Sequence, residues 1–210
     1  MSAGIALAVL GDPLAYTRSP ALHRAGLAAV GVPGSSAALR TSADALGERL
    51  RELAAHGFRG ANLTTPLKEI ALEHVDRVSE PARRARSVNT IGFGPDGTWG
   101  DTTDGPGFAD FLGTLGRDPG RERVWILGAG GAARSVALAL VEIGASVAVS
   151  ARRPEAARAS WRGIPGVVMR SWGAAPPVAE PTLVINATPS DPARLDRLPR
   201  RTLIVDLRYG

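Results

Sequence analysis

The residue best suited to acid–base chemistry is Lys68, the only lysine in a chain with 25 lysines and arginines together. Arginine supplies the rest of the positive charge, and a guanidinium stays protonated and offers five hydrogen-bond donors. An ammonium differs because it can release its proton near neutral pH and so act as a general acid or base. A surface lysine without a function fits the composition equally well.

The position of Lys68 favours chemistry. It ends the segment Asn62-Leu63-Thr64-Thr65-Pro66-Leu67-Lys68, which places it in the first turn of an expected helix that begins with Pro66, just past an expected strand at 58–63. Ligands gather at the carboxyl ends of strands in α/β proteins. A helix N-terminus disfavours a cation, which favours the neutral amine. Asp104 is the natural carboxylate partner, although it also precedes an expected helix and could cap it.

A glycine-rich turn marks a second site. The segment Gly128-Ala129-Gly130-Gly131-Ala132-Ala133 follows an expected strand at 124–127 and opens an expected helix. Such a turn lets the backbone approach a pyrophosphate, whose charge the helix N-terminus stabilises. About 20 residues on, where an NAD site usually offers an acid to the ribose, the sequence has Arg152 and Arg153. Two guanidiniums suit a 2′-phosphate, so the pattern predicts NADP over NAD, with solvated surface arginines as the alternative.

Strands and helices alternate along the chain. Expected strands lie at 5–10, 37–40, 58–63, 88–93 and 98–102, and then at 124–127, 147–150, 167–169, 183–185 and 203–205. A helix from Ser19 carries Leu22, Ala25, Gly26 and Ala29 on one face. A linker is expected at 116–120. We therefore predict two α/β domains, residues 1–104 and 105–210, the second with an open parallel sheet.

Composition narrows the class of protein. The 210 residues are 44% apolar and 21% charged, as in soluble globular proteins. The absence of cysteine excludes disulfides, thiolate metal sites and cysteine nucleophiles. No apolar stretch is long enough to span a bilayer, and the run at 5–10 has no basic segment before it, so it suits a strand and not a signal peptide. We expect a cytoplasmic protein.

The net charge of +5 and the sequence pI near 10.8 raise the question of nucleic-acid binding. Such binding needs basic residues gathered on one face. Here arginine pairs are spread over 83–84, 152–153 and 200–201, with acids between them and few aromatic residues for base stacking. Anionic small molecules are therefore the favoured partners, and we expect neither nucleic acid nor membrane.

Four motifs together carry a family resemblance. N-x-T-x-P-x-K at 62–68, V-N-T at 88–90, T-D-G at 103–105 and G-A-G-G-A-A-R at 128–134 resemble, in order and spacing, those of the shikimate dehydrogenase family. Further matches run from Gly11 to His23, from Ile185 to Pro189 and from Asp206 to Tyr209, so the resemblance spans essentially the whole chain. It implies an N-terminal α/β substrate-binding domain followed by a Rossmann-like dinucleotide-binding domain.

The resemblance also implies roles for individual residues. The implied substrate-binding residues are Thr17 and Ser19 for a carboxylate, Asn62, Thr64, Asn89 and Asp104 for ring hydroxyls, and Tyr209 nearby. Lys68 and Asp104 form the implied catalytic pair, and no metal is implied. The implied cofactor-binding residues are Gly128, Ala129, Gly130, Gly131, Ala132, Arg152, Arg153 and Thr188. The implied reaction is reversible reduction of 3-dehydroshikimate to shikimate by NADPH, in aromatic amino acid and chorismate biosynthesis, by a monomer or homodimer.

Some positions depart from the family pattern. Ala151 and Arg153 flank Arg152 where the family has Asn-Arg-Thr, and Arg86 and Ser87 replace a small Gly-Ala pair. The family continues past the position of Gly210 with residues flanking the nicotinamide and with C-terminal helices, so we expect a C-terminally short second domain without those helices. Two alternatives stay open: a quinate or aminoshikimate dehydrogenase using NAD, and a non-catalytic homologue that binds ligand without turnover.

Overall fold

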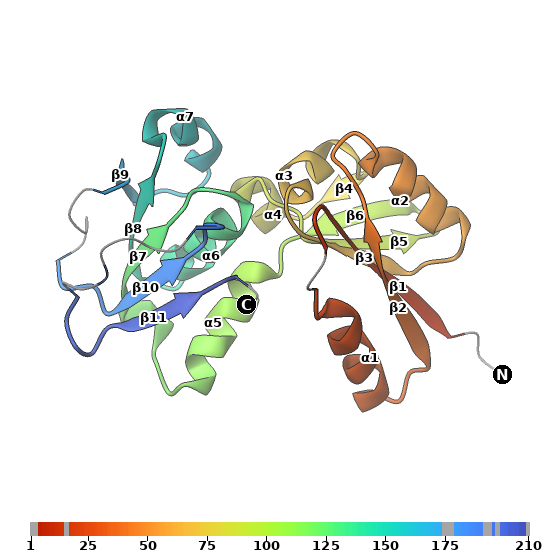
Figure 1. The fold of residues 1–210 in the computed structure, drawn as a ribbon, viewed down its shortest axis with the longest axis horizontal. Coiled ribbons are helices and arrows are strands. Elements are labelled where there is room, and N and C mark those ends of the chain that lie inside the picture. Colours follow the sequence, from red (N-terminus) through yellow and green to blue (C-terminus); the bar gives the residue numbers. More distant parts are fainter. Residues whose placement is uncertain (1–3, 15–16, 174–178, 191–194, 196–197, 209–210) are drawn as a thin grey trace. The chain divides into compact units, whose positions relative to one another are not determined.

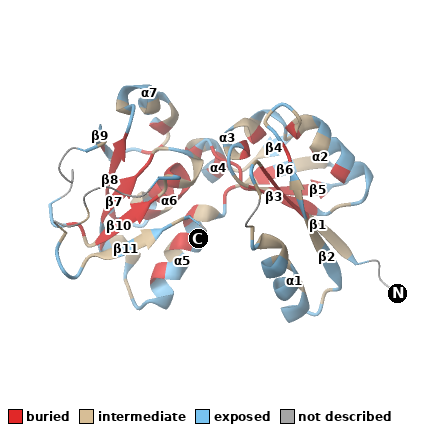
Figure 2. Ribbon diagram, in the orientation of Figure 1, coloured by how far each residue is buried: buried red, intermediate tan, exposed pale blue. Residues whose placement is uncertain are grey.

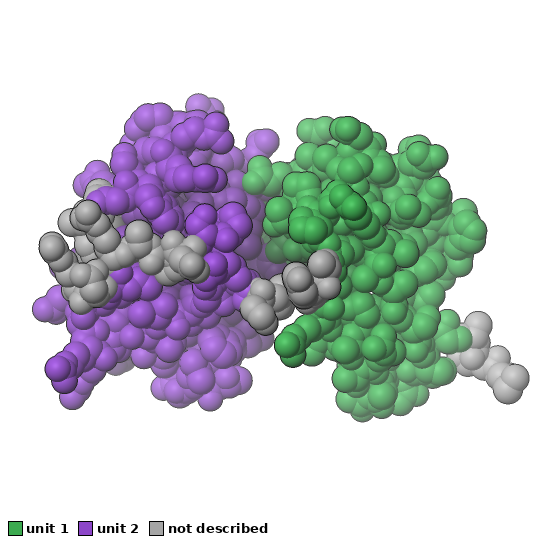
Figure 3. Space-filling view, viewed as in Figure 1, with its two compact units in different colours: residues 1–82, 87–102, 209–210 green, residues 83–86, 103–208 purple. Residues whose placement is uncertain are grey.

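The computed structural model describes residues 4–14, 17–173, 179–190, 195 and 198–208. They form two compact units (Figure 3). Unit 1 holds the chain up to Ala82 and then Ser87–Thr102, and unit 2 holds Arg83–Arg86 and Thr103–Arg208. Residues 83–86 thus belong to unit 2 although the residues on both sides of them belong to unit 1.

Unit 1 is built on a six-stranded sheet with the order β2-β1-β3-β5-β6-β4 (Figure 1). Its strands are β1 (Ile5–Gly11), β2 (Gly34–Arg40), β3 (Gly60–Leu63), β4 (Arg77–Val78), β5 (Thr90–Gly94) and β6 (Gly97–Asp101). β1 pairs in parallel with β2 and β3, whereas β5 is antiparallel to β3 and β6. The β5–β6 hairpin turns at Gly97, whose φ of +99° lies in the region that glycine reaches without strain.

The helices of unit 1 cover its sheet unequally. They are α1 (Ser19–Ala29), α2 (Leu46–Ala55) and α3 (Leu67–Ile70), with α4 (Glu80–Ala85) beginning in unit 1 and ending in unit 2. The core lies between the sheet and α2, where Leu10 packs with Leu46 and Leu50. α1 lies on β1 and β2 and contributes no buried residue (Figure 2).

The face of α1 that is apolar in sequence is the exposed one. Leu22 is 65% exposed, and Ala25, Gly26 and Ala29 are exposed with it. The helix instead contacts the sheet through His23, whose Nδ1 lies 2.8 Å from Ser36 Oγ on β2. The sequence pattern found the helix and the shared face correctly, but that face has no partner within the described part of the chain.

Unit 2 is a parallel five-stranded sheet with the order β11-β10-β7-β8-β9. Its strands are β7 (Arg123–Leu127), β8 (Ser146–Ala151), β9 (Val168–Ser171), β10 (Leu183–Asn186) and β11 (Leu203–Asp206), and its helices are α5 (Asp104–Thr114), α6 (Gly131–Glu142) and α7 (Pro154–Arg158). The strand order reverses between β7 and β10, and ligands bind at the carboxyl ends of strands at such a reversal. The α/β class with a Rossmann-like second sheet is therefore confirmed.

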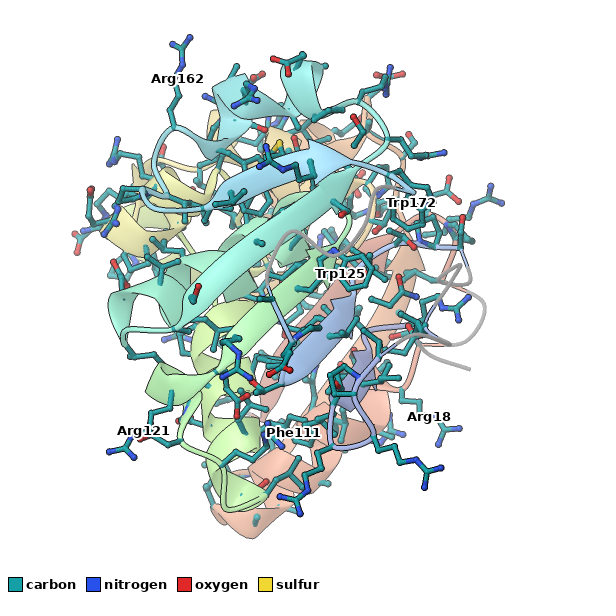
Figure 4. All side chains as sticks on the ribbon, turned by 90° about the vertical axis from the view of Figure 1, so that its left-hand side faces the viewer. Arg18, Phe111, Arg121, Trp125, Arg162 and Trp172 are labelled. Atoms are coloured by element: carbon teal, nitrogen blue, oxygen red, sulfur yellow. The ribbon has the colours of Figure 1, made fainter. Side chains whose placement is uncertain are left out.

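The central strands β7, β8 and β10 of the second sheet are buried on both faces, which explains their continuous apolar runs. On one face Ile126 and Ile185 pack with α6 residues such as Leu140. On the other, Trp125 and Val184 pack with Trp172 (Figure 4). The arginines Arg121 and Arg162 extend into solvent at opposite ends of this unit, so its positive charge is dispersed (Figure 4).

Several local expectations need correction. The helix expected to carry Pro66 in its first turn starts at Leu67 and ends at Ile70, followed by a 3-10 helix at Ala71–Glu73. So short a helix sums few peptide dipoles and exerts little field on Lys68. The linker expected at 116–120 contains a 3-10 turn at Pro119–Arg121. None of the described helices is long and apolar enough to cross a membrane.

Candidate functional site

In unit 1 the loops that follow β1 and β3 meet. The Thr64 N–H donates to Leu10 O at 2.9 Å, and the Asp12 N–H donates to Thr65 O at 3.0 Å. A Cβ at Gly11 would lie 2.4 Å from Thr64 Cγ2 and 3.1 Å from Thr65 O, so glycine at this position leaves room for the close approach. The segment Thr64–Lys68 therefore begins at the carboxyl end of β3, next to the carboxyl end of β1.

A network of polar side chains lies beside this junction. Asn62 Nδ2 donates to Asn89 O at 3.1 Å and to Thr90 Oγ1 at 3.0 Å. Thr90 Oγ1 in turn donates to Asn89 Oδ1 at 3.0 Å, and Asn89 is 7% exposed. The structure thus brings together Asn62 and Asn89, which lie 27 positions apart in the chain.

Lys68 is tied to the same junction through its backbone. Its carbonyl accepts the Val88 N–H at 2.8 Å, which fixes α3 against the residue before Asn89. Its side chain is half-buried. The N-x-T-x-P-x-K and V-N-T motifs are therefore one structural unit, with Lys68 at its margin.

The other expected substrate residues lie on separate elements. Thr17 and Ser19 stand at the start of α1, where Thr17 Oγ1 accepts the Ser19 N–H at 3.3 Å. Asp104 is the first residue of α5 in unit 2, so it lies within the helix rather than before it. Tyr209 lies outside the described residues.

In unit 2 the glycine-rich turn lies where the strand order reverses. Gly128 has a φ of +109°, and its N–H donates to Ser150 O at the end of β8 at 2.9 Å. A Cβ at Gly128 would lie 2.8 Å from Ala187 O and 2.9 Å from Thr188 Cγ2. Glycine is therefore required at 128 both for conformation and for space. The structure brings Thr188 against this turn, as a shared ligand site needs.

Thr188 is held by the end of β10. Its hydroxyl donates to Asn186 Oδ1 at 2.8 Å, and Asn186 Nδ2 donates to Asp206 Oδ2 at 3.2 Å. Hydrogen bonds from Arg208 lower the pKa of Asp206 to about 2, so this carboxylate stays ionised near neutral pH. The I-N-A-T-P and D-L-R motifs thus form one polar network at the carboxyl ends of β10 and β11.

Arg152 and Arg153 follow β8 directly and are exposed. Neither has an ion-pair partner among the described residues. The Gly128 N–H donates to the carbonyl of Ser150 in β8, so the end of β8 lies next to the glycine turn. Arg152 and Arg153 are the two residues that follow this strand end. They are available to an anion there.

Two residues to which the sequence analysis gave no role contact the turn. Arg134 Nη1 and Trp161 Nε1 each donate to Ala129 O at 3.2 Å. The signal that could have found Arg134 is a charged residue in the first turn of a helix whose neighbours are apolar, since a buried arginine must be hydrogen-bonded. Within the described ranges, no three His, Asp or Glu side chains gather so as to hold a metal ion.

The fold and these two sets of residues define a class, the two-domain nicotinamide-dependent dehydrogenases, with an α/β substrate domain ahead of a Rossmann-like domain. Residues 9–91 match the model of the shikimate dehydrogenase substrate binding domain. Shikimate dehydrogenase (NADP(+)) of Acidiphilium cryptum is 42% identical over 86% of this chain and 65% of its own length. A Thermus thermophilus protein of the same name is 41% identical over 96% of this chain and 77% of its own length. This chain belongs to the shikimate dehydrogenase family.

Solved structures agree. A shikimate 5-dehydrogenase of Thermus thermophilus, in complex with NADP(H) and shikimate, has a TM-score of 0.84 and 38% identity, over 96% of this chain and 78% of that one. Shikimate dehydrogenase of Aquifex aeolicus has a TM-score of 0.87 and 25% identity, over 99% of this chain and 80% of that one. This chain spans 65% of the length of the Acidiphilium relative and 77% of that of the 41% identical Thermus relative.

Proposed function

We propose that this protein catalyses the reversible NADP-dependent interconversion of shikimate and 3-dehydroshikimate. The observation that carries the proposal is the similarity of this chain, with a TM-score of 0.84 and 38% identity, to a shikimate 5-dehydrogenase solved with NADP(H) and shikimate. Unit 1 presents the hydrogen-bonded Asn62 and Asn89 at its strand ends, and unit 2 presents the glycine turn at its strand reversal. In this proposal residues 1–104 are the substrate-binding and catalytic domain, although residues 83–86 and 103–104 of it pack in unit 2, and residues 105–210 bind NADP.

The proposed substrate-binding roles are those that the family resemblance implies, and the chemistry of the side chains supports them. Thr17 and Ser19 offer hydroxyl donors to the substrate carboxylate, and Tyr209 is proposed as a further substrate-binding residue. Asn62, Thr64, Asn89 and Asp104 bind the ring hydroxyls. The amides of Asn62 and Asn89 can each both donate and accept. Because the Asn62 amide is already held by Asn89 O and Thr90 Oγ1, its remaining oxygen is presented in a fixed orientation.

Lys68 and Asp104 are the proposed catalytic residues. When bound, NADPH supplies the hydride that reduces the ring ketone. Lys68 holds the proton that passes to the ketone oxygen as it becomes a hydroxyl, and Asp104 orients the ammonium and the substrate hydroxyl. In the reverse direction the neutral amine of Lys68 takes that proton back.

The cofactor-binding roles belong to unit 2. Residues 128–132 hold the pyrophosphate at the N-terminus of α6, and Thr188 lines the cofactor beside Gly128. Arg152 and Arg153 bind the 2′-phosphate, because a guanidinium matches phosphate oxygens with paired donors. We further propose that the protein is cytoplasmic and that it is a monomer or homodimer. Light scattering on the purified protein would test the oligomeric state.

The direct test is reduction of NADP by shikimate, followed by absorbance of the reduced nicotinamide. We expect turnover with shikimate and NADP, and markedly less with NAD, quinate or an aminated shikimate analogue. Absence of shikimate-dependent reduction would overturn the proposal. Calorimetric binding of both ligands without turnover would identify a non-catalytic homologue, and preferred turnover of quinate with NAD would identify the related dehydrogenase.

A further inference from the structure

The carbonyl of Ala129 in the glycine turn accepts two buried donors. Arg134 Nη1 and Trp161 Nε1 each lie 3.2 Å from its oxygen. Arg134 is 2% exposed and Trp161 is 5% exposed. Because both side chains are enclosed by protein, they fix the direction of this carbonyl.

Arg134 is itself held from the opposite side. Its Nε donates to Ala85 O at 2.6 Å, and its Nη2 donates to Arg86 O at 2.9 Å, at the end of α4. These three carbonyls belong to unit 2, as does Ser160, whose Oγ lies 3.4 Å from Arg134 Nη1. The planar guanidinium fork can span carbonyls on two segments at once, which the ammonium of lysine cannot do in the same geometry.

The direction of the Ala129 carbonyl determines that of the next N–H. Across a trans peptide bond the carbonyl and the following N–H point in opposite directions. With Ala129 O held toward the protein interior, the Gly130 N–H is directed away from it. Gly130 adjoins open space, since a Cβ there would meet no heavy atom within 4 Å. The Gly130 N–H has no acceptor among the described residues.

We propose that Arg134 and Trp161 are positioning residues that orient the Ala129–Gly130 peptide, so that the Gly130 N–H binds the pyrophosphate of the dinucleotide. The proposal rests on the proposed use of NADP and adds two residues that do not touch the cofactor. A positioning role predicts a loss confined to ligands that carry the pyrophosphate.

The test compares two nucleotides with two variants. NADP contains the pyrophosphate, whereas adenosine 2′-monophosphate keeps the adenine and the 2′-phosphate without it. We expect Arg134→Lys and Trp161→Phe each to raise the Kd of NADP about tenfold, as expected for one hydrogen bond to a charged group. The Kd of adenosine 2′-monophosphate should stay within about twofold. In the double variant the Kd of NADP should rise by less than the product of the two single-variant increases, because both hydrogen bonds orient the same peptide.

Arg117→Lys is the matched control. Arg117 also bridges two segments of unit 2, through Glu122 and Thr182 O, but at the amino ends of β7 and β10. Arg117→Lys should lower the free energy of unfolding without changing the Kd of NADP or that of adenosine 2′-monophosphate. The proposal would be overturned if Arg134→Lys and Trp161→Phe raised the Kd of both nucleotides equally, or if they left the Kd of NADP unchanged. Should Arg134→Lys fail to fold, Trp161→Phe decides alone, because it keeps an aromatic ring and removes the donor.

Binding is measured without turnover, so failure to oxidise shikimate would count against the proposed function and leave this inference standing. A wild-type protein that binds neither nucleotide would overturn both.

Discussion

Lys68 is the residue whose substitution addresses the proposed chemistry most directly. Lys68→Arg keeps the positive charge but replaces a titratable amine with a group that stays protonated. We expect kcat to fall by about 10²- to 10⁴-fold, the usual contribution of general acid–base catalysis. The Kd of NADP should not change, because the glycine turn belongs to unit 2 and Lys68 to unit 1. Steady-state kinetics with calorimetry measures both, and near-normal kcat would refute the role.

Arg86, which stands where the family resemblance implies a glycine, has a strained backbone conformation. Its φ is +48°, in the left-handed region that disfavours side chains, and its side chain is exposed. We expect Arg86→Gly to be more stable than Arg86→Ala by about 1 kcal/mol, because only glycine relieves the strain. Urea unfolding of the two variants checks this difference. Equal stability would mean that the backbone at 86 relaxes.

The sequence predicted which residues meet at each site only where those residues belong to the family motifs. Asn62 and Asn89 were expected to act together, and the structure joins them by a hydrogen bond. Arg134 and Trp161 received no role, because their convergence on Ala129 depends on how α6 and the chain after α7 pack. Local pattern contains no information on such packing between elements.

Among the elements, the contact between α5 and α6 depends on one glycine. A Cβ at Gly105 would lie 2.3 Å from Ser135 O and 2.9 Å from Ala139 Cβ. We expect Gly105→Ala to lower the free energy of unfolding by about 1–3 kcal/mol, the usual cost of overpacking. It should also reduce kcat, since Asp104 precedes it.

Gly107→Ala in the same helix is the control. Nothing lies within 4 Å of a Cβ at Gly107, so alanine there should stabilise α5 by about 0.5–1 kcal/mol through helix propensity. Thermal unfolding of the two variants gives the comparison. Two variants of equal stability would show that α5 can move away from α6 without cost.

Elements were predictable where apolar periodicity is long and unbroken. The expected strand at 124–127 became β7, and the strand at 147–150 became β8, each longer by one or two residues. Short elements gave too little pattern, so α4 and α7 were not anticipated. Ser79, which accepts the Ala82 N–H, and Pro154 at the start of α7 were the available signals.

Acid should lower the stability of unit 2, the larger part of the molecule, through Glu122. Glu122 is 6% exposed and is bound by Arg117 Nε at 2.7 Å and by the Thr182 hydroxyl. Burial alone would raise its pKa, but the hydrogen bonds from Arg117 and Thr182 outweigh burial and hold the pKa below its ordinary value of 4.5. Its stabilising contribution is therefore complete above pH 4.5 and is lost as the pH falls below that value.

Glu122→Gln tests this dependence. At pH 7 it should lower the free energy of unfolding by about 2 kcal/mol, the scale of a buried charged hydrogen bond. The difference from wild type should shrink below pH 4.5. Urea unfolding followed by tryptophan fluorescence reports mainly on unit 2, which contains three of the four tryptophans, Trp125, Trp161 and Trp172, whereas Trp99 lies in unit 1. A difference that stays constant with pH would contradict the assignment.

Because residues 83–86 belong to unit 2, the gene cannot be divided at a single position into one part for each unit. Neither unit is a contiguous stretch of coding sequence, because the chain enters unit 2 at Arg83, leaves it after Arg86 and re-enters it at Thr103. Ala85 is fully enclosed there, and Arg84 Nε donates to Gly163 O at 3.2 Å. Exchange of the cofactor-binding half at a single crossover would import a surface that no longer fits this segment. Changes of cofactor preference in this lineage are therefore expected to arise by point substitution, at positions such as Arg152 and Arg153, and not by shuffling of whole domains.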